Sequence, residues 1–433
     1  MRAFFRCFTG CAGEYPLTQA IYRCPKCDSL LTVQHDMKAL AAESGEAWRK
    51  RFDARWSARA ASGVWSKKEW VAPEIADDAI VTTGEGMTPL YPARRLAAEW
   101  GFGEILVKQC GTTHTGSFKD LGMTVLVSVV NHAKRIGALD VKAIACASTG
   151  DTSAALAAYG AAAGLPVVVL LPRGMVSVAQ LVQPLANGAK VLALETDFDG
   201  CMKIVRELAA RGLVYLANSM NPLRIEGQKT VALEIAQQLD WQPPDWVVIP
   251  SGNLGNASAL YAGFAMAKEL GVIDRLPRLA VAQAANANPM YRAFVAKKKD
   301  VDAVVAKATQ ASAIRIGNPV SAPRAMAALD AMNGVVEEAT ENELADACAR
   351  ADRTGLYADP HTGVALACAR KLRERNVISA TDRVVIVSTA SALKFTEFKL
   401  GYHEKKLPEV ESELANVPIA LPPDVDVVSR NLQ

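Results

Sequence analysis

The feature that most constrains the fold is a regular alternation of two kinds of segment, which begins near residue 104. Short runs rich in Val, Ile, Leu and Ala are separated by longer segments of small or amphipathic residues. This alternation predicts an α/β fold with doubly wound, mainly parallel sheets that carry helices on both faces. Several runs are apolar throughout, as strands covered on both sides require. The strand candidates, enough for two sheets, are 105–109, 143–147, 167–171, 190–193, 214–217, 246–249, 279–283 and 384–387.

The two ends of the chain differ from this central part. Residues 1–80 contain four clustered cysteines and four of the seven tryptophans, which indicates an N-terminal module of less regular structure. Residues 403–433 contain four prolines, and we expect them to form an extended tail over the surface.

Composition narrows the class of protein. Half of the 433 residues are hydrophobic and 21% are charged, which excludes a disordered chain. The net charge of +3 gives no argument for binding nucleic acid or a membrane surface. Residues 154–171 carry no charge, but Gly160, Gly164 and Pro166 divide them into a helix, a turn and a strand, so we expect no membrane span. The first residues contain no apolar stretch of signal-peptide length, and we expect a cytoplasmic protein.

Three polar turns stand where a strand candidate gives way to a helix candidate, at residues 116–120, 148–153 and 251–256. Hydroxyls and glycines at such junctions let free helix N–H groups bind an anion. Ligands of α/β proteins bind at the carboxyl ends of the strands, so the three turns predict one shared crevice. None of them contains a Walker lysine or a dinucleotide fingerprint.

Lys119, in the first of these turns, is the candidate reactive residue. We expect Ser117 to cap the helix that follows, with Asp120 completing a capping box. Lys119 then lies at the positive end of the helix dipole, which lowers the pKa of its ammonium group and suits a nucleophilic or Schiff-base lysine. An ordinary surface lysine beside a helix cap is the alternative.

These turns, in this order, resemble the threonine synthase family of fold type II pyridoxal-phosphate (PLP) enzymes, most closely its plant-type branch. The resemblance extends over about residues 30–400 and implies two lobes. Residues 81–112 and 216–402 would form a large PLP-binding lobe, and residues 113–215 a small lobe that carries Lys119. The segments that carry the resemblance are 33–37 (VQHDM), 62–70 (SGVWSKKEW), 84–90 (GEGMTPL), 114–120 (HTGSFKD), 145–153, 218–229 (NSMNPLRIEGQK), 252–256 and 360–365 (PHTGVA).

The resemblance implies which residues hold the cofactor. Lys119 would form the internal aldimine with PLP, and the backbone amides of residues 252–256 would bind its phosphate. Asp151 would stand at the 3′-oxygen, and Thr389 would bond the pyridine nitrogen, with Ser388 as the second choice. The cofactor-binding residues implied are therefore Lys119, Asp151, Gly252, Asn253, Leu254, Gly255, Asn256 and Thr389.

The substrate implied by the resemblance is O-phospho-L-homoserine, which reacts with water to give L-threonine and phosphate. Lys119 would move protons at Cα and Cβ of the substrate. Arg224 can grip a phosphate with two N–H groups. By analogy with the family we also expect a homodimer. The residues implied to hold the substrate phosphate are Ser148, Thr149, Thr152, Asn218, Ser219 and Arg224.

One departure from the family pattern lies after the last strand candidate, where Ser391 and Ala392 replace a His-Gly pair. Another enzyme of the same fold, a cysteate synthase or a threonine/serine dehydratase, is therefore one alternative. Arg224 favours a phosphorylated substrate over those of the dehydratases. The alternative from another class is a non-catalytic paralogue used for binding or regulation, and the presence of Lys119 counts against it.

The clustered cysteines, Cys7, Cys11, Cys24 and Cys27, are spaced like the ligands of a zinc ribbon. Four thiolates would form a closed structural zinc site, with free thiols or a redox pair as alternatives. Basic residues are too few around them for a nucleic-acid footprint. The five histidines are too dispersed to form a ligand set, although two of them, His114 and His361, are candidate neighbours of the active site.

Overall fold

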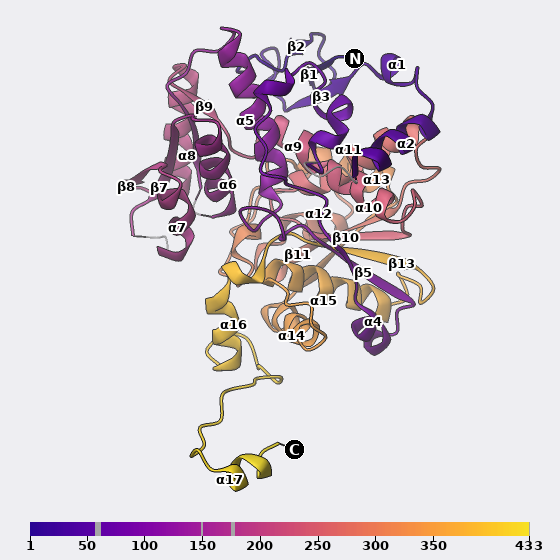
Figure 1. Ribbon diagram of the computed structural model, residues 1–433, viewed down its shortest axis with the longest axis vertical. Coiled ribbons are helices and arrows are strands. Elements are labelled where there is room, and N and C mark those ends of the chain that lie inside the picture. Colours follow the sequence, from indigo (N-terminus) through magenta and orange to yellow (C-terminus); the bar gives the residue numbers. More distant parts are fainter. Residues whose placement is uncertain (57–61, 149, 175–177, 433) are drawn as a thin grey trace.

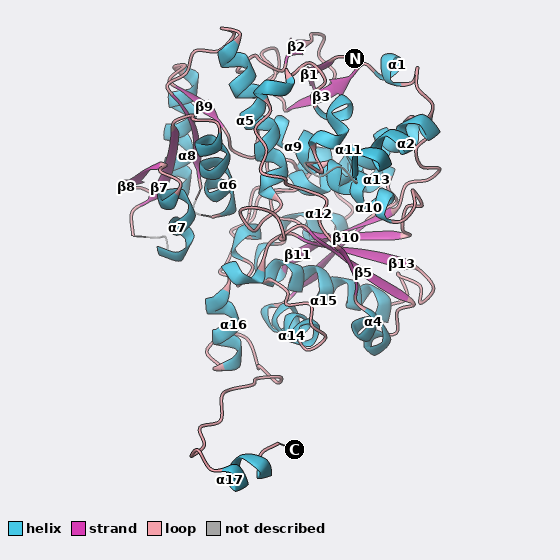
Figure 2. Cartoon of the chain, in the orientation of Figure 1, coloured by secondary structure: helices cyan, strands magenta, loops and turns pink. Residues whose placement is uncertain are grey.

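The computed structural model of the chain describes residues 1–433 apart from 57–61, 149, 175–177 and 433. It contains two mainly parallel sheets flanked by helices, a small antiparallel sheet near the N-terminus and a C-terminal arm (Figures 1 and 2). The predicted α/β architecture with two mainly parallel sheets is confirmed.

The larger sheet has six strands in the order β12-β11-β10-β13-β5-β4, and the edge strand β4 runs antiparallel to β5. Along the central strand β10, Val247 and Ile249 pack into one hydrophobic cluster while Trp246 and Val248 pack into another. The sheet is therefore buried on both faces, which explains its apolar sequence. The strands are β4 (Leu90–Pro92), β5 (Glu104–Gln109), β10 (Trp246–Pro250), β11 (Arg278–Ala284), β12 (Val335–Ala339) and β13 (Arg383–Ser388).

The smaller sheet has four parallel strands in the order β8-β7-β6-β9. All four coincide with predicted strand candidates, and they lie within residues 113–215 except for the last residue of β9. The strands are β6 (Ala143–Ala147), β7 (Val167–Pro172), β8 (Lys190–Leu194) and β9 (Val214–Leu216), and the helices beside them are α6 (Asp151–Ala162), α7 (Val178–Ala186) and α8 (Phe198–Ala210).

Strand β12 was missed by the sequence pattern because Glu337 and Glu338 interrupt its apolar run. In the fold Glu337 is buried and forms ion pairs with Arg375 and, at 3.7 Å, Lys371. The remaining helices of this part of the chain are α4 (Arg94–Trp100), α5 (Lys119–Arg135), α9 (Leu223–Gln228), α10 (Thr230–Gln238), α11 (Gly255–Glu269), α12 (Pro289–Val295), α13 (Ala322–Ala331), α14 (Glu341–Asp352) and α15 (Pro360–Glu374).

The N-terminal segment packs onto the body and shares its hydrophobic core. The rings of Trp48, Phe52 and Trp70 contact one another at centroid distances of 5.1 to 5.6 Å, and they belong to the same cluster as Val247 of β10. The antiparallel sheet has the order β2-β1-β3. Its strands are β1 (Ala3–Cys7), β2 (Tyr15–Pro16) and β3 (Leu31–His35), followed by α1 (Met37–Leu40), α2 (Gly45–Trp56) and α3 (Lys68–Val71).

Only the first part of the C-terminal segment packs against the rest of the molecule. After α16 (Thr396–His403), the backbone N–H of Asn416 donates a hydrogen bond to Nδ1 of His403 at 3.0 Å. Beyond that point the chain extends away from the body and ends in α17 (Val425–Arg430) (Figure 1). The expectation of a tail that lies over the surface is therefore wrong for residues 417–432. No helix among the described residues is long and apolar enough to cross a membrane.

Candidate active site

Hydrogen bonds tie two of the predicted turns to segments that follow other strands. The backbone N–H of Phe118, beside Lys119, donates to the carbonyl of Thr389 at 2.9 Å. In the same region the Asn253 amide donates to Ser219 at 2.8 Å, which links the turn after β10 to the turn after β9. The structure thus brings together segments that lie more than 270 residues apart in the sequence.

Lys119 is the first residue of α5 and is partly buried, with its Nζ 4.1 Å from the centre of the Phe118 ring. Burial, followed by the positive charge of Arg224, lowers the pKa of Lys119 to about 7, against the opposing effect of Asp151. A large fraction of the amine is therefore neutral near pH 7, which is the state a nucleophilic lysine needs.

The capping box predicted for α5 is wrong. Phe118 occupies the N-cap position without a side-chain cap, and the Lys119 N–H reaches Ser117 Oγ only at 3.4 Å. Asp120 instead turns back to the preceding loop, where its carboxylate accepts hydrogen bonds from the backbone N–H of Thr115, at 2.7 Å, and from the Thr115 hydroxyl. Burial raises the pKa of Asp120 to about 6. Asp120 therefore shapes the loop that presents Lys119.

The turn between β10 and α11 keeps its backbone N–H groups free. Leu254, at φ +65°, precedes the first residue of α11, and a Cβ at Gly252 would lie 2.6 Å from the Cα of Ile314. Within the described part of the chain, the N–H groups of Gly252, Asn253 and Leu254 donate no hydrogen bond. Three free donors at the start of a long helix suit a phosphate.

The side chains of this turn brace it. The side-chain amide oxygen Oδ1 of Asn253 accepts a hydrogen bond from the Val320 N–H at 2.9 Å. Asn256 accepts one from the Ser251 hydroxyl at 2.5 Å and donates to the Pro250 carbonyl at 2.9 Å. These bonds hold the loop in one shape while leaving its N–H groups available.

Arg224, in the first turn of α9, is 3% exposed and incompletely paired. Its guanidinium donates two long hydrogen bonds, to the Ala217 carbonyl at 3.3 Å and to the Thr152 hydroxyl at 3.4 Å. The buried Nε has no partner among the described residues. Burial lowers the pKa of Arg224 to about 10. A buried cation with spare donors is a fitting site for an anion, because leaving it unpaired costs stability.

The other residues expected around a phosphate differ in availability. Asn218 exchanges two hydrogen bonds with the backbone of Ala147, at 2.8 and 3.0 Å, so its amide is engaged in fastening the end of β6. Ser148 accepts a bond from the Gly150 N–H at 3.3 Å. Thr149 lies outside the described residues.

Two hydroxyls follow β13, and the structure distinguishes them. The hydroxyl of Ser388 accepts a hydrogen bond from that of Thr362 at 2.9 Å. The hydroxyl of Thr389 has no hydrogen-bond partner among the residues that the structure describes. Of the two, Thr389 is the one with a free hydroxyl.

Lys394 was not predicted from the sequence as a site residue. Its Nζ forms an ion pair with Asp151 at 2.6 Å and donates to the Thr115 carbonyl at 3.0 Å and to Gln183 at 3.2 Å. Lys394 therefore ties the segment after β13 to α6, to α7 and to the lysine loop. Its position close to the altered pair 391–392 was the available signal, but its partners lie in remote segments.

The altered pair itself keeps an ordered turn. Ser391 Oγ accepts a hydrogen bond from the Leu393 N–H at 3.4 Å and caps a short helical turn, and the Ser391 N–H donates to the Gly116 carbonyl at 2.9 Å. Ala392 is buried. The segment that carries the departure from the family pattern is thus attached to the loop of Lys119.

The two candidate histidines differ in burial and in hydrogen bonding. His361 is buried and satisfied on both ring nitrogens, with Nδ1 2.6 Å from Asp359 and Nε2 accepting from the Ala313 N–H at 3.0 Å. His114 is exposed. We therefore give His361 a structural role.

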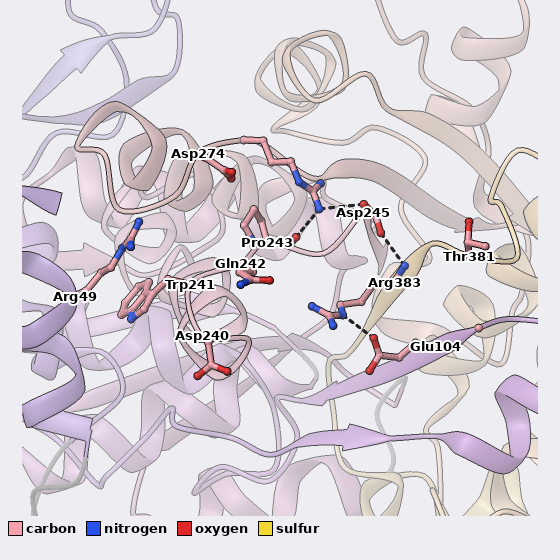
Figure 3. Close-up of a pocket in the computed structure, with 12 residues that line it drawn as sticks. Arg49, Glu104, Asp240, Trp241, Gln242, Pro243, Asp245, Asp274, Thr381 and Arg383 are labelled. Carbon is pink, nitrogen blue, oxygen red and sulfur yellow. Dashed lines mark hydrogen bonds and ion pairs between the residues drawn. The ribbon is translucent and has the colours of Figure 1, made fainter. Parts of the chain in front are cut away.

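A large cavity lies at the amino ends of the strands of the large sheet (Figure 3). It has a volume of about 570 Å³ and is lined by Glu104 and Arg383, the first residues of β5 and β13, and by Asp245, which precedes β10. These residues mark the amino ends of parallel strands, whereas the predicted turns follow the carboxyl ends. The cavity is therefore remote from Lys119.

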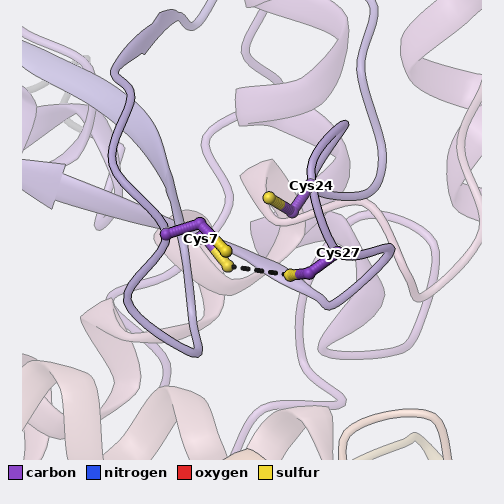
Figure 4. A group of neighbouring side chains, drawn as sticks. Cys7, Cys24 and Cys27 are labelled. Carbon is purple, nitrogen blue, oxygen red and sulfur yellow. Dashed lines mark hydrogen bonds between the residues drawn. The ribbon is translucent and has the colours of Figure 1, made fainter.

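The four N-terminal cysteines come together (Figure 4). The Sγ atoms of Cys7, Cys11, Cys24 and Cys27 all lie within 4.8 Å of one another, and those of Cys7 and Cys27 are 3.5 Å apart. Tetrahedral Zn–S bonds of about 2.3 Å place sulfur atoms about 3.8 Å apart. The cluster therefore has the size of a four-thiolate metal site.

The sequence model of the family described as "Pyridoxal-phosphate dependent enzyme" matches residues 81–390. This span includes the three turns predicted to bind anions and defines the class of protein as a PLP-dependent enzyme.

Individual relatives define the branch. "Threonine synthase 2, chloroplastic" of Arabidopsis thaliana is 55% identical over 413 residues, which cover 94% of this chain and 79% of that protein. The threonine synthase of Methanocaldococcus jannaschii is 38% identical over 425 residues and 98% of both chains. The solved threonine synthase of Escherichia coli shares the fold, with a TM-score of 0.68 and 20% identity over 99% of both chains. The chain belongs to the threonine synthase family of fold type II PLP enzymes.

Proposed function

We propose that this protein converts O-phospho-L-homoserine and water to L-threonine and phosphate. The observation that carries the proposal is the buried guanidinium of Arg224, whose Nε has no partner among the described residues, on a helix packed directly against α5, the helix that Lys119 begins. A neutral amine suits bond formation with a carbonyl cofactor, and a buried guanidinium with an unpaired Nε suits a phosphate. The unpaired arginine also favours a phosphorylated substrate over the substrates of the related dehydratases.

The residues of the site fit pyridoxal phosphate. We assign its phosphate to the free N–H groups of the turn 252–256, its ring nitrogen to Thr389 and its carbonyl carbon to Lys119. Asp151 is assigned to the 3′-oxygen, and its ion pair with Lys394 keeps net negative charge away from that oxygen. When bound, the cofactor supplies an electron sink for negative charge on the substrate carbon.

The other groups act on the substrate directly. Arg224 and the Thr152 hydroxyl hold and orient its phosphate, with Ser148 and Ser219 at the ends of neighbouring strands. Lys119 is the base at the site, and with a pKa of about 7 it can take a proton from carbon and return it near neutral pH. On the family resemblance we also assign Thr149 and Asn218 to the phosphate, with Asn218 acting through its bonds to Ala147.

The proposal is tested by phosphate release from O-phosphohomoserine and from O-phosphoserine with PLP-loaded protein, with the amino-acid products identified. We expect threonine and phosphate, in equal amounts, from phosphohomoserine. Lys119→Ala protein is the control for phosphate released without catalysis. Turnover of phosphoserine alone would assign the enzyme to another synthase of this fold, and no turnover of either compound would favour a non-catalytic paralogue.

We further propose that the four cysteines hold one structural zinc ion, since their number, type and spacing fit a closed tetrahedral site. Metal analysis of the purified protein should find about one zinc per chain. Cys24→Ser should lose the metal and lower the Tm by several degrees, whereas Cys201→Ala, at a buried cysteine elsewhere, should keep it. Metal-free protein with four titratable thiols at full stability would contradict the assignment.

We also propose a homodimer, supported by the C-terminal arm. Helix α17 has six residues, none of them buried, and the arm exposes Ile419, Val425 and Leu432 by 70 to 83%. So short a helix is marginal alone, and a second copy of the chain would cover these side chains. Truncation after Asn416 should weaken the dimer in sedimentation experiments, and an unchanged dimer would exclude a role of the arm in dimer formation.

A cytoplasmic location stays a prediction, and the name of the Arabidopsis relative places that protein in the chloroplast.

A further inference from the structure

A buried ionic cluster lies outside the set of reacting groups. It joins His35, at the end of β3 in the N-terminal segment, to Glu226 of α9 and to Lys229, which follows α9. His35 Nε2 is 2.7 Å from a Glu226 carboxylate oxygen, and Lys229 Nζ is 2.5 Å from the same oxygen. The three side chains are only 3 to 5% exposed.

The protons of this cluster can be assigned from its geometry. His35 Nε2 also lies 3.0 Å from Lys229 Nζ, but one ring nitrogen cannot donate to Glu226 and accept from Lys229 at once. Burial and the charge of Lys229 lower the pKa of His35, against the opposing effect of Glu226, which favours the neutral ring. Glu226 is the shared acceptor, so the Nε2–H is assigned to it. His35 thus supplies a neutral donor beside the Glu226–Lys229 ion pair.

Helix α9 carries both Glu226 of this cluster and Arg224 of the proposed phosphate site. Glu226 is two residues after Arg224, so the two side chains leave opposite sides of the same short helix. A helix of six residues has little stability of its own, and its place is set by its neighbours.

One neighbour of α9 is α5, the helix of Lys119. A Cβ at Gly227 would lie 1.6 Å from the Leu121 carbonyl oxygen, and one at Gly122 would lie 2.8 Å from the Arg224 carbonyl oxygen. The two helices therefore meet backbone to backbone. Helix α9 packs against α5 on one side, and the His35–Glu226 hydrogen bond attaches it to β3.

The N-terminal segment has a second contact with the same region. The Tyr22 hydroxyl accepts a hydrogen bond from the Leu216 N–H at 2.8 Å, at the end of β9 and just before Asn218 and Ser219. The N-terminal segment thus contacts both elements that lead into the phosphate site.

We propose that His35 is a positioning residue of the phosphate site: from β3 it holds α9 through Glu226 and so fixes where Arg224 presents its guanidinium. This inference rests on the proposed role of Arg224 in binding phosphate. Segments 33–37 and 226–229 both carry the family resemblance. The inference assigns them a role in positioning Arg224.

The test compares variants of His35 in the PLP-loaded full-length protein. His35→Phe removes the donor and keeps the Glu226–Lys229 pair, whereas His35→Gln places an amide N–H near the position of Nε2. Gln34→Ala is the matched control, since the neighbouring side chain on β3 is exposed and bonds Arg6. Binding of inorganic phosphate is measured by calorimetry, and KM and kcat are measured with O-phosphohomoserine.

We expect His35→Phe to weaken phosphate binding and to raise KM, each roughly tenfold, with kcat and the visible absorbance of lysine-bound PLP unchanged. His35→Gln should recover most of the affinity, and Gln34→Ala should match the wild type. If His35→Phe does not fold, His35→Asn replaces it, because the shorter amide does not reach Glu226. Wild-type phosphate affinity and KM in the folded donor-free variant would overturn the inference.

The phosphate measurement separates this inference from the proposed function. A wild-type protein that binds phosphate through Arg224 and loses that binding in His35→Phe supports the inference even where phosphohomoserine is not turned over. A wild type that makes threonine, with no effect of His35→Phe on either readout, keeps the function and rejects the positioning role.

Discussion

Arginines at the carboxyl ends of the parallel strands (the carboxyl edge) and at their amino ends (the amino edge) are in opposite states. At the carboxyl ends of β6 and β9, Arg224 is buried, bonded only at 3.3 and 3.4 Å, and carries an Nε without a partner among the described residues. At the amino edge, Arg383 pairs with Glu104 at 2.6 Å and Arg275 pairs with Asp245 at 3.0 Å, beside the cavity of about 570 Å³ (Figure 3).

The size of a cavity does not locate the reactive site. The paired arginines at the amino edge have their charge balanced by the protein itself. Leaving Arg224 short of partners costs folding free energy, and function is the reason to keep such a group. The carboxyl edge is also where Lys119 begins its helix.

The largest effect is expected from removing the lysine. Lys119→Ala should lower kcat with phosphohomoserine by about 10³-fold or more, because both the covalent link to the cofactor and the base are lost. The visible absorbance and its sensitivity to borohydride should vanish, while the fold persists by circular dichroism. A borohydride-reducible band that survives in this variant would place the reactive lysine elsewhere.

The next effect compares the two kinds of arginine. Arg224→Met should raise KM for phosphohomoserine by about 100-fold, because hydrogen bonds from a charged donor are lost. Arg383→Met at the other edge should leave KM unchanged. Equal kinetic effects of the two substitutions would remove the distinction between the edges.

Arg224→Met and Arg383→Met should also differ in their effect on stability, and here the larger loss is expected at Arg383. Arg224→Met is expected to leave the Tm of the cofactor-free protein unchanged or to raise it, because an incompletely paired buried charge is removed. Arg383→Met should cost less than about 1 kcal/mol, since it breaks a solvent-exposed ion pair. Thermal denaturation of both variants measures this, and a large loss of Tm in Arg224→Met would assign the arginine to structure.

A smaller effect concerns pH. Because the pKa of Lys119 is lowered to about 7, its neutral amine predominates above that pH, and the rate of PLP capture by cofactor-free protein should level off there. Removing the positive charge in Arg224→Met favours the ammonium form, so the midpoint should move upward by less than about one pH unit. Stopped-flow absorbance checks this, and a capture rate that keeps rising to about pH 10 would indicate an ordinary lysine.

Much of the fold and part of the site were predictable because they depend on local pattern. Apolar runs located most strands of both sheets, but β4 and β12 were not predicted. Strand β12 contains Glu337, whose burial depends on its ion pairs with Arg375 and Lys371. The anion turns were visible as glycines and hydroxyls between strand and helix.

The supporting contacts were not predictable, because each joins remote segments. Lys394 meets Asp151 across 243 positions, and His35 meets Glu226 across 191, so neither pair leaves a local spacing in the sequence. The capping box failed for a related reason: Asp120 had a competing partner, Thr115, just before the helix. Local rules place the elements, and tertiary partners decide what their polar side chains do.

A crystal structure of the PLP-loaded protein in inorganic phosphate tests the assignment of the site directly, since arginines lie at both the carboxyl and the amino ends of the strands. Phosphate is expected at the carboxyl edge, bonded to Arg224 and close to Thr152. Phosphate bound beside Arg275 and Arg383 in the amino-edge cavity, with Arg224 left without it, would contradict the assignment of the site.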